Sequence, residues 1–159
     1  MSITMEKDAW QIDPVTQRVT PDEALGNPAL IVVESGYALS AAVQEVCDFL
    51  QIAVYSTQDP RGIPALVPDI RPLAIIQEAE EVDCTVYDLL MVVAGYDPAL
   101  PVMMVLPENP QNRGALDAAR RLWQIDDLTH SPEHPGIRAL IEFLFHAGRR
   151  IGQGRFMPI

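Results

Sequence analysis

The residues that could do chemistry follow short apolar runs along the chain. Glu34-Ser35 comes after one such run, Gln77-Glu78 after another, and Thr129–Pro132 after a weaker one. Together they offer carboxylates, hydroxyls and an amide. Ser35 is next to Glu34 only in sequence, and no histidine is placed near it to act as a base. We therefore expect no enzyme activity from these residues.

A second group, His130-Ser-Pro-Glu-His134, places two imidazoles and a carboxylate within five residues. Zinc sites use such side chains, but a loop that contains proline leaves their directions unconstrained, and no cysteine is adjacent. A solvated loop before a helix explains the group more simply. The phosphate-binding patterns GxGxxG and GxxxxGK[ST] do not occur in the sequence. We predict no metal site and no cofactor.

The elements that position these residues alternate along the chain. Runs typical of buried strands occupy residues 29–34, 52–56, 73–77 and 101–106, with a weaker candidate at 124–129. Apolar residues at helical spacing predict helices over 38–50, 82–94, 109–123 and 135–151. Strands that are apolar on both faces and separated by helices favour an α/β fold. We expect a (βα)5 doubly wound, five-stranded parallel sheet in a flavodoxin-like three-layer sandwich.

One segment of this pattern is rich in proline. Residues 58–72 contain prolines at positions 60, 64, 68 and 72. A proline in a helix interior costs roughly 3 kcal/mol. We therefore predict that any helix here is a short piece between prolines.

Length and composition set the class of protein. The chain has 159 residues, of which 48% are hydrophobic, which is enough for one domain with a real core. No apolar run approaches the ~18 residues that span a membrane, and the polar N-terminus does not resemble a signal peptide. Cys47 and Cys84 are too few for a disulfide framework, so we expect a cytoplasmic protein. The net charge of −11 argues against a nucleic-acid partner, because phosphate backbones attract lysine and arginine.

The charge is unevenly distributed. Residues 30–112 contain twelve acidic and two basic residues, whereas residues 113–159 contain seven arginines and five acids. Solvated helix faces of opposite sign would explain this. The alternative is a basic C-terminal third that contacts an acidic partner or a second copy.

The order of elements resembles the receiver domain of two-component response regulators. The resemblance covers roughly residues 29–150 and includes the segments ALIVVESG, PLAIIQ and DPALPVMMVL. It implies three parts: an N-terminal extension over residues 1–28, a receiver-like domain over 29–150 and a C-terminal tail over 151–159.

Receivers accept a phosphoryl group on an aspartate that ends the third strand. Acids after the first strand hold Mg²⁺, and a hydroxyl and a lysine after the fourth and fifth strands hold the phosphoryl oxygens. The corresponding positions here are occupied by Gln77, by Glu34-Ser35, by Leu106 and by Ser131 or the neighbouring His130, while the one lysine of the chain is Lys7. An amide cannot attack phosphorus. The resemblance therefore implies a pseudo-receiver, in which these positions form a degenerate phosphorylation pocket.

Receivers commonly pair through their last two helices and fifth strand. The resemblance thus implies a protein partner, such as a regulator or a kinase, or a homodimer through this face. The residues expected at that contact are Arg120, Arg121, Phe143, Phe145, His146 and Arg149. Alternatively, the N-terminal extension, with Trp10, Ile12 and Val15, covers one of the apolar helix surfaces.

Two functions remain open at this point. The first is a stand-alone pseudo-receiver that acts in signal transduction through phosphorylation-independent protein contacts. The second is a small-molecule-binding flavodoxin-like domain that uses the cleft at Glu34, Ser35, Gln77 and Leu106.

Overall fold

The computed structural model describes residues 28–152. Strands and helices alternate over this range. The elements are β1 (Ala29–Val33), α2 (Ala38–Leu50), β2 (Ala53–Thr57), the 3-10 turn η2 (Pro60–Gly62), α3 (Ile63–Ile70), β3 (Ala74–Glu78), α4 (Cys84–Tyr96), β4 (Val102–Val105), α5 (Pro110–Trp123), β5 (Leu128–Ser131) and α6 (Ile137–Gly152). The proposed N-terminal extension and C-terminal tail lie almost wholly outside the described residues.

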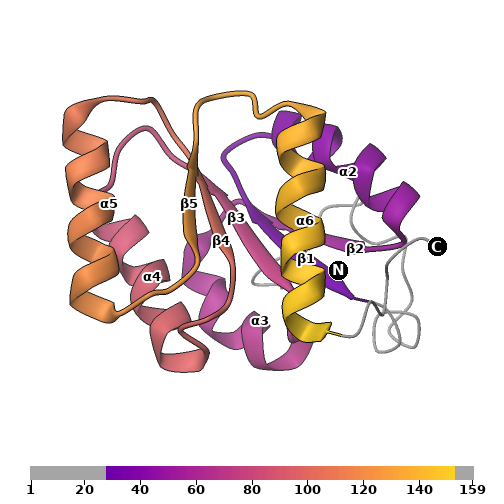
Figure 1. Cartoon of the computed structure of the whole chain (residues 1–159), viewed down its shortest axis with the longest axis horizontal. Helices are drawn as coiled ribbons and strands as arrows, with labels where there is room; N and C mark the ends of the chain where they lie inside the picture. The colour runs from indigo at the N-terminus through magenta and orange to yellow at the C-terminus, as the bar shows by residue number, and fades with distance from the viewer. Residues whose placement is uncertain (1–27, 153–159) are drawn as a thin grey trace.

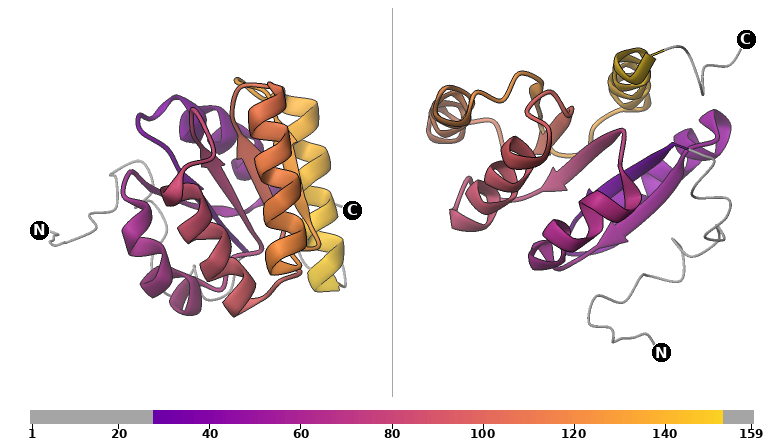
Figure 2. Two further views of the ribbon diagram at one scale, coloured as in Figure 1. Left: turned by 90° about the vertical axis from the view of Figure 1, so that its left-hand side faces the viewer. Right: turned by 90° about the horizontal axis from the view of Figure 1, so that it is seen from below.

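The five strands form one parallel sheet in the order β2-β1-β3-β4-β5. Helices α2 and α6 cover one face of the sheet, and α3, α4 and α5 cover the other (Figures 1 and 2). The predicted fold class, a doubly wound three-layer sandwich, is confirmed.

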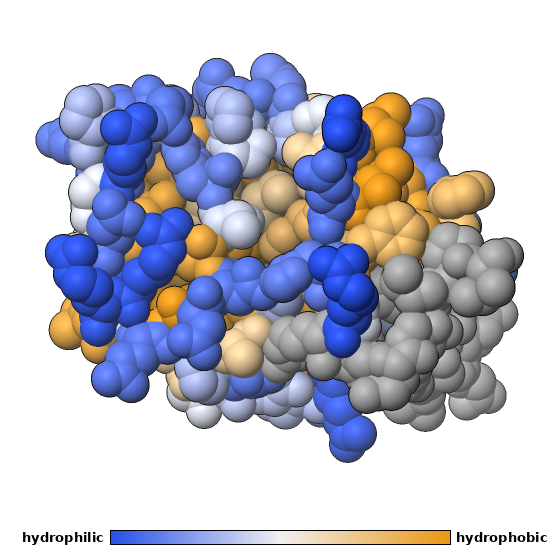
Figure 3. Space-filling view, in the orientation of Figure 1, coloured by the Kyte–Doolittle hydropathy of each residue, from blue (hydrophilic) through white to orange (hydrophobic). Residues whose placement is uncertain are grey.

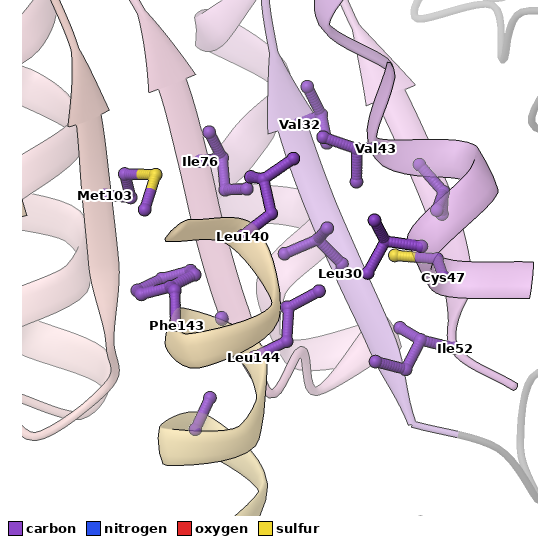
Figure 4. Close-up of a cluster of buried hydrophobic side chains, with 14 of the residues drawn as sticks. Leu30, Val32, Val43, Cys47, Ile52, Ile76, Met103, Leu140, Phe143 and Leu144 are labelled. Atoms are coloured by element: carbon purple, nitrogen blue, oxygen red, sulfur yellow. The ribbon is translucent and has the colours of Figure 1, made fainter. Parts of the chain in front are cut away.

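The core consists of two layers, one on each side of the sheet. Side chains alternate along a strand, so Leu30 and Val32 of β1 pack toward α2 and α6, while Ile31 and Val33 pack toward α3, α4 and α5. Figure 4 shows the first of these layers. Within the described residues, no helix combines the length and apolar character needed to cross a membrane.

The fifth strand lies further along the chain than predicted. It was expected at residues 124–129, but the pairing with β4 runs over Leu128–Ser131. Gln124 adopts a left-handed conformation (φ 54°) that ends α5, and Ile125 is buried in the core. The three residues that follow Gln124 are therefore used to return the chain to the sheet, and the strand begins only afterwards.

The proline-rich segment also differs from its prediction. Helix α3 is short, as expected, but it contains Pro64 and Pro68 instead of lying between prolines. Pro64 stands in the first turn, where no N–H is needed for a helical hydrogen bond. Pro68 lies inside the helix, which ends two residues later, before Arg71 turns left-handed (φ 53°). The helix tolerates Pro68 because so little helix follows it.

Candidate functional site

The predicted pocket residues come together at the carboxyl edge of the sheet. Val33 is paired with Gln77, so Glu34 and Gln77 lie on neighbouring strand ends. The backbone N–H of Leu106 donates to the carbonyl of Ser131 at 3.1 Å. Four of the five predicted pocket residues therefore lie at one edge of the sheet, namely Glu34, Gln77, Leu106 and Ser131. The fifth, Ser35, directly follows Glu34 in the sequence.

Glu34 is buried and its carboxylate is fully engaged. The backbone N–H groups of Leu39 and Ser40 each donate to it at 3.0 Å, and the Ser56 hydroxyl donates at 3.2 Å. Only 3% of Glu34 is exposed. The N-cap residue of α2, Tyr37, gives no side-chain hydrogen bond to the start of the helix. Glu34 therefore caps α2 from the end of β1 and ties the helix to β2.

Gln77 is the most informative residue of the edge. It is 2% exposed, and its Oε1 atom accepts no hydrogen bond from any described residue. Strand alternation places its side chain with Ile75, toward α3, α4 and α5, whereas the Glu34 carboxylate binds α2 and β2 on the other side of the sheet. The two side chains thus belong to neighbouring strands but to opposite faces.

The remaining pocket positions add little polar character. Leu106 is fully buried in the layer under α3, α4 and α5. Ser131 is also buried, and its hydroxyl donates to the carbonyl of Pro132 at 2.9 Å. Ser35 is exposed. Within residues 28–152, no side-chain hydrogen bond joins any two of these five residues, so they share an edge of the sheet without forming a polar network.

A charged cluster that sequence reasoning missed sits at the same edge. His130 places Nδ1 3.0 Å from Glu108 Oε1 and Nε2 2.9 Å from the carbonyl oxygen of Leu106. The Glu108 carboxylate oxygen and the Leu106 carbonyl oxygen are both acceptors. Both ring nitrogens can therefore donate at the same time only when each carries a proton, as in the imidazolium form. Arg113 of α5 pairs with the same Glu108. The position of His130 before Ser131-Pro132 was the only sequence signal for this cluster.

His130 and His134 do not converge. His134 is exposed and adopts a left-handed backbone conformation (φ 58°), while His130 faces Glu108 and Leu106. Among the described residues, no group of three or more histidines, cysteines and acids could hold a metal ion.

Asn112 was also missed, and it braces the loops at this edge. It is 3% exposed, its Nδ2 donates to the carbonyl of Pro107 at 2.8 Å, and its Oδ1 accepts from the N–H of Val82 at 3.4 Å. The side chain thereby joins the loop after β3 to the loop after β4. In the sequence it is one polar residue in the first turn of a helix, with nothing to indicate burial.

The predicted interface residues fall into different environments. Phe143 is 6% exposed and belongs to the core, where Figure 4 places it beside Met103, so its prediction as a contact residue is wrong. Its side chain packs with the buried layer between the sheet and α6. Phe145 is half-buried against the same layer.

Most polar residues of that predicted interface form hydrogen bonds or ion pairs within the chain. Arg120 donates through Nε and Nη2 to the carbonyl of Leu128 and pairs with Asp117. His146 lies 2.6 Å from Asp127. Only Arg121 and Arg149 are exposed without such contacts in residues 28–152. Polar side chains border the face of α5, β5 and α6, and apolar atoms are visible between the two helices (Figure 3).

Cys47 and Cys84 differ in environment. Burial, followed by the negative charge of Asp48, raises the pKa of the Cys47 thiol to about 12. Cys84 is exposed at the start of α4. The Cys47 thiol is therefore a neutral part of the core.

Comparison with known proteins supports the fold. No protein-family model and no curated protein matches this sequence. Among solved structures, an orphan response regulator of H. pylori is similar with a TM-score of 0.59 at 12% identity, covering 77% of this chain and 97% of that one. The non-phosphorylated HemR receiver domain of Leptospira biflexa is similar with a TM-score of 0.58 at 14% identity, covering 76% and 94%.

The chemotaxis protein CheY4 of Vibrio cholerae is similar to a comparable degree. Its TM-score is 0.57 at 15% identity, and the match covers 76% of this chain and 98% of that one. At these identities the similarity concerns the fold. The chain has a receiver-like fold, in agreement with the resemblance in its sequence.

Proposed function

We propose that this protein is a pseudo-receiver that acts in signal transduction through protein contacts that do not depend on phosphorylation. The observation that carries the proposal is Gln77. It stands at the end of the third strand of a receiver-like fold, buried and neutral. An amide has no nucleophilic oxygen that could take up a phosphoryl group.

The neighbouring positions support the same proposal. Leu106 presents no hydroxyl, and Ser131 presents no positive charge. Glu34 keeps a carboxylate, but three donors already occupy its oxygens. These groups position α2, and they offer little to an incoming phosphate.

The alternative of a small-molecule-binding domain has less support. The similar solved structures include response regulators and receiver domains. Three of the four side chains assigned to its cleft, those of Glu34, Gln77 and Leu106, are buried.

The test is a phosphorylation assay on the full chain. The protein is incubated with acetyl phosphate and Mg²⁺, and its intact mass is measured, with an aspartate-containing receiver domain as positive control in the same mixture. We expect the mass to stay unchanged while the control gains a phosphoryl group. A gain that maps to a carboxylate at the sheet edge, such as Glu34 or Glu78, would contradict the proposal.

A further inference from the structure

The helical layer formed by α3, α4 and α5 carries part of the exposed apolar surface of the described residues. Six large apolar side chains are exposed among residues 28–152. Three of them, Met91, Tyr96 and Leu122, lie on α4 and α5. Leu122 is 70% exposed. Figure 2 (left) shows the three helices side by side on this face. The other three exposed apolar residues are distributed between the α2 region and the start of α6.

The apolar surface contains a groove between α4 and α5. Its volume is about 690 Å³, and it is lined by Tyr87, Ala118, Ala119, Arg121, Leu122 and Trp123. The rings of Tyr87 and Trp123 meet edge to face with their centroids 5.6 Å apart. The small side chains of the two alanines leave room between the helices. A second hollow of about 610 Å³ lies on the opposite side of α4, between α3 and α4.

Each hollow has one charged side chain without a partner among the described residues, and the two are of opposite sign, whereas Asp59 and Arg61, which also line the second hollow, pair with each other. Arg121 lines the first hollow and Asp88 lines the second, and neither has an ion pair or hydrogen bond within residues 28–152. By contrast, the guanidinium groups of Arg61, Arg113 and Arg120 are each paired with a carboxylate of the same chain. Arg121 therefore has a free positive charge beside an apolar groove.

The two unpaired charges lie at the same level of the helical layer. The ring contact joins Tyr87 to Trp123, so Asp88, which follows Tyr87, and Arg121, two residues before Trp123, lie at a similar height along the two helices. They stand on opposite sides of α4, because Arg121 belongs to α5 and Asp88 faces the hollow toward α3. A two-fold axis that runs along α4 would exchange these sides and bring each Arg121 opposite the Asp88 of a second copy.

We propose that this surface is the interface between two copies of the chain. Each copy places Leu122 against the apolar surface of the other, and each Arg121 pairs with the partner's Asp88. The inference rests on the proposed function, since it identifies the partner and the surface of a contact that needs no phosphoryl group. It replaces the face of α5, β5 and α6, where Phe143 is buried and Arg120 and His146 are bound within the chain.

The first experiment measures the mass of the full chain in solution by sedimentation over a wide concentration series. We expect a dimer that dissociates on dilution. The variant Leu122→Glu should raise the dissociation constant roughly 30-fold or more, as for the loss of an interface hot spot. The matched controls Phe49→Glu and Ile137→Glu change exposed apolar residues on α2 and α6, and they should dimerise like the unchanged chain.

The second experiment exchanges charges. In a dimer of the Arg121→Glu variant, a glutamate faces Asp88 at both contacts. In a dimer of the Asp88→Arg variant, an arginine faces Arg121 at both contacts. Each variant alone should therefore be mainly monomeric. Mixing the two variants should restore dimers, because a heterodimer pairs opposite charges at both positions. Thermal unfolding of each variant verifies that these exposed substitutions leave the fold intact.

The outcomes separate this inference from the proposed function. A chain that stays monomeric at all concentrations, a dimer that Leu122→Glu does not weaken, or single-charge variants that fail to complement each other would each overturn the interface. None of these results bears on phosphorylation. A mass gain in the phosphorylation assay would overturn the function and leave the measured dimer unaffected.

Discussion

At the scale of single residues, Glu34 is a buried carboxylate with a structural role. Its carboxylate accepts two backbone N–H groups of α2 and the hydroxyl of Ser56. Buried hydrogen bonds to a charged acceptor are worth more than neutral ones, and the donors would be left unpaired without it. The residue at the end of β1 therefore stabilises the first helix.

The variant Glu34→Ala should lower the free energy of unfolding by about 2 to 3 kcal/mol, because it removes the acceptor of three hydrogen bonds. Urea unfolding measures this. The matched control is Glu45→Ala, an exposed carboxylate on the same helix, which should change the value by no more than about 0.5 kcal/mol. Equal effects of the two substitutions would show that Glu34 does not cap α2.

The two cysteines should differ in reactivity. The pKa of Cys47 is raised from 9.0 to about 12, chiefly by burial, so its reactive thiolate is scarce in the folded chain. Iodoacetamide at about pH 8 should add one group, at Cys84, and a second only after denaturation. Peptide mass mapping identifies the sites, and rapid labelling of Cys47 in the folded chain would contradict its burial.

The same shift has a defined sign in the stability of the protein. Because the folded pKa of Cys47 lies above the unfolded value, the contribution of the neutral thiol to stability is fully present below pH 9.0. It is lost as the pH rises from there toward about 12.

Sequence reasoning placed Glu34, Gln77 and Leu106 at one edge of the sheet but did not give their environments. Glu34, Gln77 and Leu106 follow or end apolar runs, and parallel strands bring such ends to one edge. The direction of each side chain could not be predicted, because it depends on the pairing register and on the helix packed above. The same limit explains why Asn112 and the contact between His130 and Glu108 were missed.

At the scale of elements, α6 shows how a helix can be predicted correctly while its faces are not. Leu140, Phe143, Leu144 and Ala147 are buried, while Ile137 is 59% exposed. The buried face of the helix therefore includes Phe143, which was expected on the face that contacts a partner. Periodicity alone could not fix which face is buried, because Ile137, Phe143 and Phe145 are all apolar.

This pattern of burial predicts the effects of two substitutions on α6. Phe143→Ala should lower the free energy of unfolding by about 3 to 5 kcal/mol, since it removes a buried ring from the core. Ile137→Ala should change it by about 0.5 kcal/mol or less. Chemical denaturation of both variants tests the assignment, and a small effect of Phe143→Ala would restore that residue to the surface.

The strands were predicted more closely than the connections between them. Four apolar runs coincide with β1 to β4 to within one residue at each end, because buried parallel strands leave a continuous apolar signal. The fifth strand, with the sequence LTHS, has no such signal. Its position is set by the pairing of Val102 with Leu128 and by the turn at Gln124, which only the folded chain shows.

At the scale of the whole molecule, a receiver-like fold carries a neutral amide, Gln77, at the end of its third strand. The core of two layers and the parallel sheet form with this amide at the strand end. The proposed function depends on the surface of the molecule, and the apolar groove between α4 and α5 is the part of it that we propose as a contact. The account therefore predicts a contact that is independent of phosphorylation.

The most direct test of this claim is the self-association of the full chain, measured by sedimentation with and without acetyl phosphate and Mg²⁺. We predict the same dissociation constant in both conditions, because no side chain at the sheet edge takes up the phosphoryl group. A dissociation constant that changes when the phosphoryl donor is added, together with a gain in intact mass, would contradict the account.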